Sequence, residues 1–352
     1  MITHKKYMQR AIDIAKLGAG NVAPNPMVGC VIVHNDTIIG EGWHQKFGEA
    51  HAEINALNNV KNKDLLSQST VYVTLEPCSH YGKTPPCANA LINHGIKKVI
   101  VGITDPNPLV SGSGIKLLRQ SGIEVVTDIL ANECAELNKR FITYITQNRP
   151  YIILKWAQSY DGFIAPDRQT LTADEFEENR HITGLITQKI THLWRTYEAG
   201  IMVGTNTILT DNPKLNARAW HGPSPIRITI DLNNRLPKTL HIFDESQKTI
   251  IFNYTENINT STSIITYLPI DKDFDLAPQI LNELYKQNIQ SVIIEGGTQL
   301  LETFINSNNW DEAQVLTSPK QLINGVKAPA ISGNITHKFA SNLNSISILK
   351  PL

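Results

Sequence analysis

The alternation of short apolar runs with helical patterns limits what this chain can fold into more than any other feature. A helical pattern opens the chain at residues 7–17, and strand-like runs then alternate with further helical patterns as far as residue 126. Such alternation is typical of α/β proteins. The sequence therefore predicts an α/β unit with strands at 28–33, 37–42, 70–75, 98–102 and 123–126.

A polar segment that ends in proline, residues 146–150, divides the chain, and a second α/β region follows it. The chain has 352 residues, of which 41% are hydrophobic, and this is enough for two cores. We therefore predict two domains, residues 1–147 and residues 148–352. The second is expected to contain strands at 151–157, 201–203, 226–230, 249–252 and 291–295, and helices at 188–198, 280–287 and after 298.

The bulk charge and the cysteine content exclude several classes of protein. Lysine plus arginine equals aspartate plus glutamate, so the formal net charge is zero and nothing favours a polyanionic partner such as a nucleic acid. The first seven residues lack the apolar core that a secretory signal is expected to have, and no later stretch is apolar for long enough to cross a bilayer. We expect a soluble, cytoplasmic protein with no membrane partner. Four cysteines are too few for a disulfide scaffold, and paired cysteines in a reducing compartment more often bind metal.

Four residues of the first domain form a pattern that suits a catalytic zinc ion, Zn²⁺. His51, Cys78 and Cys87 offer one imidazole and two thiolates, and catalytic zinc usually has three protein ligands and a water whose pKa falls towards about 7. Glu53 is predicted to be the catalytic residue that takes a proton from this water and passes it to a leaving amine. Zinc deaminases of nucleobases use the same order of residues. The sequence therefore favours hydrolytic deamination.

Less specific explanations of these residues are weaker. A structural zinc site normally has four ligands, and only three strong ones are offered here. A lone His-Ala-Glu or a lone cysteine pair would most often be ordinary packing or surface chemistry, but the order and the placement at predicted helix starts favour a site. We interpret Cys30, in an apolar strand, and Cys134, on a helix, as buried small residues rather than ligands.

Longer runs around these residues resemble the deaminase half of the bifunctional deaminase/reductases of riboflavin biosynthesis. The gap of eight residues between the two cysteines is longer than the two usual in cytidine and tRNA adenosine deaminases. The resemblance spans most of residues 1–145 and implies a cytidine-deaminase-like three-layer α/β/α domain. The runs that carry it are Ala23-Pro-Asn-Pro-Met-Val-Gly29, Gly40-Glu-Gly-Trp-His44, His51-Ala-Glu53 and Pro77-Cys-Ser-His-Tyr-Gly-Lys-Thr-Pro-Pro-Cys87.

This resemblance implies a substrate, a diaminopyrimidinone that carries a ribose phosphate and loses the amino group at ring carbon 2. Residues near the zinc ligands are then expected to bind it. Asn25 is placed by two prolines in a rigid loop, where its amide suits a ring edge or a ribose hydroxyl, and a turn-capping role is the alternative. Lys83 offers an ammonium group for the phosphate. The expected substrate-binding residues of the deaminase are Asn25, His44, His80, Lys83 and Asn107.

The second domain resembles the reductase half of the same family, which has a dihydrofolate-reductase-like α/β fold. The resemblance lies in the segments 155–162, 204–218 and 295–298. It implies that NADPH transfers hydride to ribose carbon 1′ of the deaminated product and opens the ring to a ribityl chain. The expected cofactor-binding residues are Ala157, Thr207, Asp211, Gly297 and Thr298. The expected substrate-binding residues are Lys155, Asn179, Arg195, Leu215, Arg218 and Glu295, with the two arginines suited to a 5-phosphate.

One segment departs from the family pattern. The family commonly has a serine and a tryptophan where this chain has Asn179-Arg180-His181, preceded by the acidic run 174–178. His181 does not reproduce an indole wall, so cofactor stacking is expected to differ.

Domains of both types often associate, and we expect a dimer or tetramer. Two alternatives stay open: a deaminase of another nucleotide or base with an inactive reductase-like domain, and a protein that binds or edits nucleic acid, which the neutral charge disfavours.

Overall fold

The computed structural model describes residues 2–81, 85–179, 181–255 and 258–352. The chain divides into two compact units, Met1–Asn148 and Arg149–Leu352. Within the described ranges, none of the helices combines the length and the apolar character needed to cross a bilayer.

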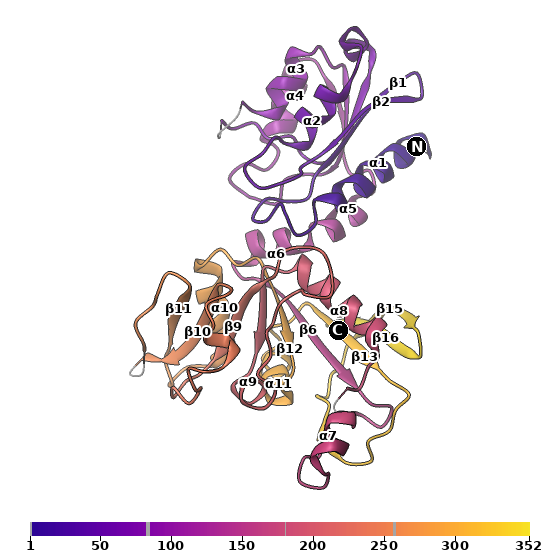
Figure 1. The fold of residues 1–352 in the computed structure, drawn as a ribbon. Helices are drawn as coiled ribbons and strands as arrows, with labels where there is room; N and C mark the ends of the chain where they lie inside the picture. The colour runs from indigo at the N-terminus through magenta and orange to yellow at the C-terminus, as the bar shows by residue number, and fades with distance from the viewer. Residues whose placement is uncertain (1, 82–84, 180, 256–257) are drawn as a thin grey trace. The chain divides into compact units, whose positions relative to one another are not determined.

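The first unit is a mixed five-stranded sheet between two layers of helices (Figure 1). Strand β1 pairs antiparallel with β2 and β3, whereas β3, β4 and β5 are parallel. In spatial order the strands are β2 (Thr37–Trp43), β1 (Gly29–His34), β3 (Thr70–Leu75), β4 (Lys98–Ile103) and β5 (Glu124–Val126). The helices are α1 (Ile2–Ala15), α2 (Ala52–Asn59), α3 (Cys87–Asn93), α4 (Ser113–Gln120), α5 (Ala131–Leu137) and α6 (Lys139–Gln147), with 3-10 helices at Lys16–Gly18 and Lys63–Gln68.

The period of two in β1 produces the two faces of this sheet. Cys30 and Ile32 point into the core formed with α2, α3 and α4, while Val31 and Val33 point into the core formed with α1 and α5. The buried Cys134 of α5 belongs to the second core. Both layers are therefore apolar, and the predicted α/β/α architecture is confirmed.

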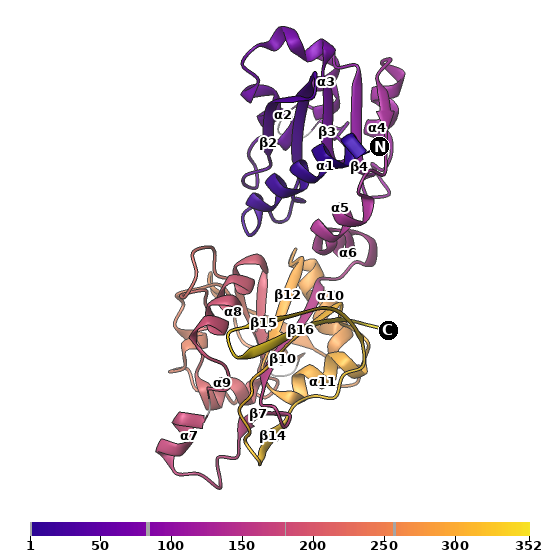
Figure 2. The same ribbon diagram turned by 90° about the vertical axis from the view of Figure 1, so that its right-hand side faces the viewer.

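The second unit is built on a nine-stranded sheet with helices on both faces (Figure 2). The strands from β11 to β13 run parallel, and β16 and β15 add an antiparallel end. In spatial order the strands are β11 (Ile265–Ile270), β10 (Thr249–Tyr254), β9 (Ile226–Ile230), β8 (Gly200–Val203), β12 (Ser291–Glu295), β6 (Tyr151–Gln158), β13 (Glu312–Thr317), β16 (Asn344–Lys350) and β15 (Asn334–Ser341).

Helices α10 and α11 pack on one face of this sheet, and α8 and α9 pack on the other (Figure 2). A separate two-stranded ribbon joins β7 to β14. The remaining elements are β7 (Phe163–Pro166), α7 (Ala173–Asn179), α8 (Leu185–Tyr197), α9 (Thr205–Asp211), the 3-10 helix His241–Phe243, α10 (Leu276–Lys286), α11 (Thr298–Asn306) and β14 (Gly325–Lys327). This unit is α/β, as predicted.

Candidate zinc centre and candidate reductase cleft

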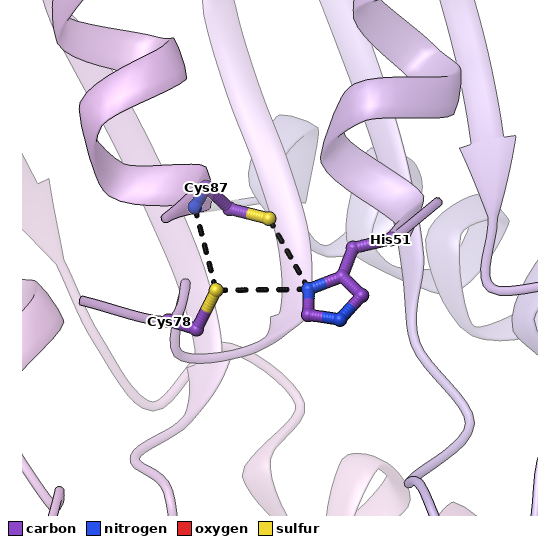
Figure 3. A group of neighbouring side chains, drawn as sticks. All are labelled: His51, Cys78 and Cys87. Atoms are coloured by element: carbon purple, nitrogen blue, oxygen red, sulfur yellow. Dashed lines mark hydrogen bonds between the residues drawn. The ribbon is translucent and has the colours of Figure 1, made fainter. Parts of the chain in front are cut away.

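The three predicted zinc ligands lie together beyond the carboxyl end of β3, the central strand of the first unit's sheet (Figure 3). His51 is the N-cap residue of α2, Cys78 lies three residues beyond the end of β3, and Cys87 is the first residue of α3. The Nδ1 atom of His51 lies 3.6 Å from the Sγ of Cys78 and 3.3 Å from the Sγ of Cys87. The backbone N–H of Cys87 also donates to the Sγ of Cys78 at 3.3 Å.

This donor set fits a zinc ion. In a tetrahedral site with Zn–S and Zn–N bonds of ordinary length, donor atoms lie about 3.4–3.8 Å apart. The two distances to His51 are close to that range, and all three ligand atoms lie within 4.8 Å of one another. The thiol of Cys87 and, less strongly, His51 lower the pKa of Cys78 to about 4, although burial opposes this. The same contact raises the pKa of Cys87, so Cys78 is the more acidic thiol of this pair.

Glu53 lies beside this group in the first turn of α2, with only 3% of its surface exposed. Burial raises the pKa of its carboxyl to about 7, and the negative charge of Cys78 adds to the effect. The Cys87 thiol has a smaller, opposite effect on this pKa. A carboxyl with a pKa near 7 exchanges protons readily at neutral pH, which suits a general acid/base.

Asn25 and His44 also lie close to the ligands. The Nδ1 of His44 lies 3.1 Å from the carbonyl oxygen of Ala50, so we assign the ring proton to Nδ1. The Nε2 of His44 then accepts from the Nδ2 of Asn25 at 3.1 Å. The His44 ring meets the His51 ring edge-on, 5.5 Å between centroids. Both ring nitrogens of His44 are therefore engaged, and its contact with Asn25 orients the amide.

Of the other predicted deaminase residues, the structure describes His80 and Asn107. His80 is exposed, and Lys83 lies outside the described residues. Asn107 is partly buried, and its Oδ1 accepts the backbone N–H of Leu109 at 3.1 Å, which is the turn-forming role that its surroundings predict.

Sequence reasoning missed Glu76, a buried carboxylate between β3 and Cys78. A carboxylate just before the Pro77-Cys78 pair was the available signal.

In the second unit, a cleft of about 940 Å³ opens where β6, β8 and β12 end. Nine of the eleven residues predicted for cofactor and substrate line it. They are Lys155, Ala157, Arg195, Thr207, Asp211, Leu215, Glu295, Gly297 and Thr298. The two others do not line the cleft: the amide of Asn179 donates to the backbone oxygen of Glu175, and exposed Arg218 donates to the Oδ1 of Asn216.

The floor of the cleft holds three charged groups on two neighbouring strands and a helix. Glu295 pairs with Lys155 in the register of β12 and β6, and the Nζ of Lys155 lies 3.4 Å from the carboxylate. Arg195, in the last turn of α8, donates to both oxygens of Glu295 at 2.8 and 2.9 Å and to the carbonyl of Asn216 at 3.0 Å. Burial alone would raise the pKa of Glu295, but the charges of Arg195 and Lys155 lower it to about 2. Burial lowers the pKa of Lys155.

Two glycines shape the cofactor side of the cleft. Gly296 and Gly297 have φ angles of +76° and +69°, which side chains rarely tolerate. A Cβ on Gly297 would lie 3.2 Å from the Oγ1 of Thr207. Backbone amides at the start of α11 can therefore approach a phosphate group, as at other helix N-termini. These residues fit a phosphorylated dinucleotide.

Two further residues of this unit were missed by sequence reasoning. Phe176 of α7 lines the cleft, and the guanidinium carbon of Arg168 lies 5.3 Å from its ring centroid. Phe176 brings an aromatic ring to the cleft from the acidic segment that departs from the family, and His181 also lines the cleft. His192 of α8 is 7% exposed, and its Nδ1 has no hydrogen-bond partner among the described residues. Burial, followed by the charges of Arg195 and Arg218, lowers the pKa of His192 to about 4.

Two family models match the chain. Residues 1–103 match the cytidine and deoxycytidylate deaminase zinc-binding region, and residues 150–338 match the RibD C-terminal domain. The chain is 39% identical to the riboflavin biosynthesis protein RibD of Aquifex aeolicus over 326 residues, which is 92% of this chain and 88% of that protein. It is also 39% identical to the RibD protein of Actinobacillus pleuropneumoniae over 336 residues, 93% of this chain and 86% of that protein.

Solved structures with the same two-part architecture are similar along the full length. A crystal structure of a diaminohydroxyphosphoribosylaminopyrimidine deaminase/5-amino-6-(5-phosphoribosylamino)uracil reductase from Thermotoga maritima is 34% identical, with a TM-score of 0.89 and 99% of both chains covered. RibD of Acinetobacter baumannii is 32% identical, with a TM-score of 0.87 and again 99% of both chains covered.

Proposed function

Because this chain belongs to the RibD family of bifunctional riboflavin-biosynthesis deaminase/reductases, which use zinc and NADPH, we propose how its residues divide the two reactions. Residues 1–147 deaminate 2,5-diamino-6-(ribosylamino)-4(3H)-pyrimidinone 5′-phosphate. Residues 148–352 reduce the ribosyl group of the product to ribityl. The observation that supports the deaminase assignment is that His51, Cys78, Cys87 and Glu53 lie together beyond the carboxyl end of β3.

In the deaminase, His51, Cys78 and Cys87 would hold the zinc ion. Zinc in such a site supplies an activated water as nucleophile. The Glu53 carboxyl takes up a proton and returns it to the departing amino group, because burial keeps its pKa near neutrality. Asn25, oriented by His44, offers its amide to the pyrimidine edge or the ribose. His80, Lys83 and Asn107 are proposed further contacts of the substrate.

In the reductase, the glycine pair and Thr298 would bind phosphate groups of NADPH, with Ala157, Thr207 and Asp211 along the remainder of the cofactor. NADPH supplies the hydride. The Lys155–Glu295–Arg195 group lies on the floor of the cleft and would bind the substrate's ribose. Arg195 is held by Glu295, which leaves Arg218 the more available arginine for the 5-phosphate. Asn179 and Leu215 are proposed to complete the substrate site.

The test is a two-stage assay with purified, zinc-loaded protein. The diaminopyrimidinone phosphate is added first and ammonia release is measured; NADPH is then added and its absorbance is followed. We expect ammonia in the first stage and NADPH oxidation only after it. Ammonia release without NADPH oxidation would contradict the reductase assignment. Deamination of another nucleotide, with none of this one, would contradict the substrate assignment.

A further inference from the structure

Glu76 is a buried carboxylate whose two oxygens accept four backbone hydrogen bonds. It stands directly after β3 and is 6% exposed. Its Oε2 accepts the N–H groups of Asp105 at 3.0 Å and Gly112 at 2.9 Å. Its Oε1 accepts those of Gly114 at 2.8 Å and Ile115 at 3.1 Å. Hydrogen bonds to a charged group are stronger than neutral ones, so this carboxylate organises the backbone around it.

The donors define what Glu76 holds together. Asp105 and Gly112 lie at the two ends of one segment, residues 105–112, which carries Asn107. Gly114 and Ile115 are in the first turn of α4. One side chain therefore closes the 105–112 segment as a loop and anchors the helix that follows it.

The same residue is joined to the zinc-ligand loop. Glu76 precedes Cys78 by two positions, and the start of α4 packs tightly against the residue between them. A Cβ on Gly114 would lie 1.9 Å from the carbonyl oxygen of Pro77, so only glycine permits this approach. The backbone N–H of Glu76 also donates to the carbonyl oxygen of Ile103 at 2.9 Å, two residues before Asp105. The 105–112 segment thus lies close to the ligand loop.

We propose that Glu76 is a positioning residue of the deaminase, which holds the 105–112 segment against the Cys78 loop so that the pyrimidine nucleotide meets a preformed surface. This inference rests on the proposed deaminase function. All four of the described hydrogen bonds that the Glu76 carboxylate accepts come from backbone N–H groups of residues 105–115. Its role is therefore in substrate binding and not in proton transfer.

The test uses the full-length zinc-loaded chain with Glu76→Gln, which keeps the size but turns one acceptor oxygen into a donor. Two backbone N–H groups then lose their acceptor, and we expect the KM for the diaminopyrimidinone phosphate to rise about tenfold or more. We expect kcat to change less than about threefold, the zinc content to stay at that of wild type, and the reductase kinetics to stay unchanged. Glu41→Gln, which removes a carboxylate paired with Arg10 in the same unit, is the matched control.

Glu76→Asp keeps the charge on a shorter side chain and should give a KM between those of wild type and Glu76→Gln. It also serves if the glutamine variant does not fold. The double variant E76D/N107A should raise the KM less than the product of the two single effects, because both act through one segment. An unchanged KM, an equal fall of zinc content and kcat, or fully independent effects would overturn the proposal. Failure of wild type to release ammonia would instead contradict the proposed function.

Discussion

The zinc centre and the reductase cleft use their charged side chains differently. In the zinc centre, the three predicted ligands lie at the starts of α2 and α3 and in the loop after β3. The buried carboxyl of Glu53 lies beside them and has a pKa of about 7. In the cleft, Glu295 is held ionised by Arg195 and Lys155 and shares its hydrogen bonds with both. The first arrangement suits proton transfer, and the second suits fixed charge for binding. Burial alone does not decide the role of a carboxyl; its partners do.

The largest expected effect is the loss of deaminase activity when the Glu53 carboxyl at the zinc centre is removed. Glu53→Gln should keep its zinc and lose ammonia release by about 10²–10⁴-fold, because the amide cannot carry the proton. Zinc content by atomic absorption and the two-stage assay measure this. Reduction of the deaminated product should be unchanged, and so should both activities of Glu49→Gln, an exposed control. Loss of zinc from Glu53→Gln would make Glu53 a ligand.

The matching change in the cleft should act on stability as well as on activity. Glu295→Gln leaves the buried cations of Arg195 and Lys155 without their partner, which costs on the order of 3–5 kcal/mol. Denaturant unfolding should show the second unit destabilised while ammonia release remains. Glu302→Gln on α11 is the control. An unaltered unfolding midpoint would show that the group is not held by charge pairing.

The stability of the second unit should depend on pH through the buried imidazole of His192. The folded pKa of His192 is about 4, below the ordinary 6.5, so the unfolded chain binds more protons between these values. The stability of the second unit should therefore be complete above pH 6.5 and fall by on the order of 1–2 kcal/mol as the pH decreases towards 4. His192→Gln should flatten this dependence in denaturant titrations, and exposed His221→Gln should not.

The smallest expected effect concerns the aromatic ring of the cleft. Phe176→Ala should weaken NADPH binding about five- to tenfold, since a ring that lines a cofactor cleft contributes about 1 kcal/mol through stacking. Phe176→Tyr should bind as wild type does, and so should Phe274→Ala at an exposed position. Fluorescence titration with NADPH measures this. Equal affinities in all three variants would place Phe176 outside the cofactor's path.

Most strands of both units could be predicted because their apolar runs are continuous, and three have the predicted bounds, at 70–75, 226–230 and 291–295. The strands after residue 311 were not predicted. In β13, buried Glu312 and Gln314 interrupt the apolar run, and the Nε2 of Gln314 donates to the Oε1 of Glu312 at 2.9 Å. In β15, seven of the eight residues are exposed, so no alternation marks the strand. Helix α6 was also missed, because its polar end was interpreted as a boundary.

The sequence by itself determined the chemistry of the zinc centre. A histidine, two cysteines and a glutamate at helix starts and a strand end carry their function in their residue types, since few other roles suit that set. The tertiary structure alone decided which ordinary residues serve these sites. Glu76 accepts four backbone hydrogen bonds, Arg195 pairs with Glu295, and Phe176 lines the cleft. These roles depend on the tertiary structure because the partners lie far away in the chain.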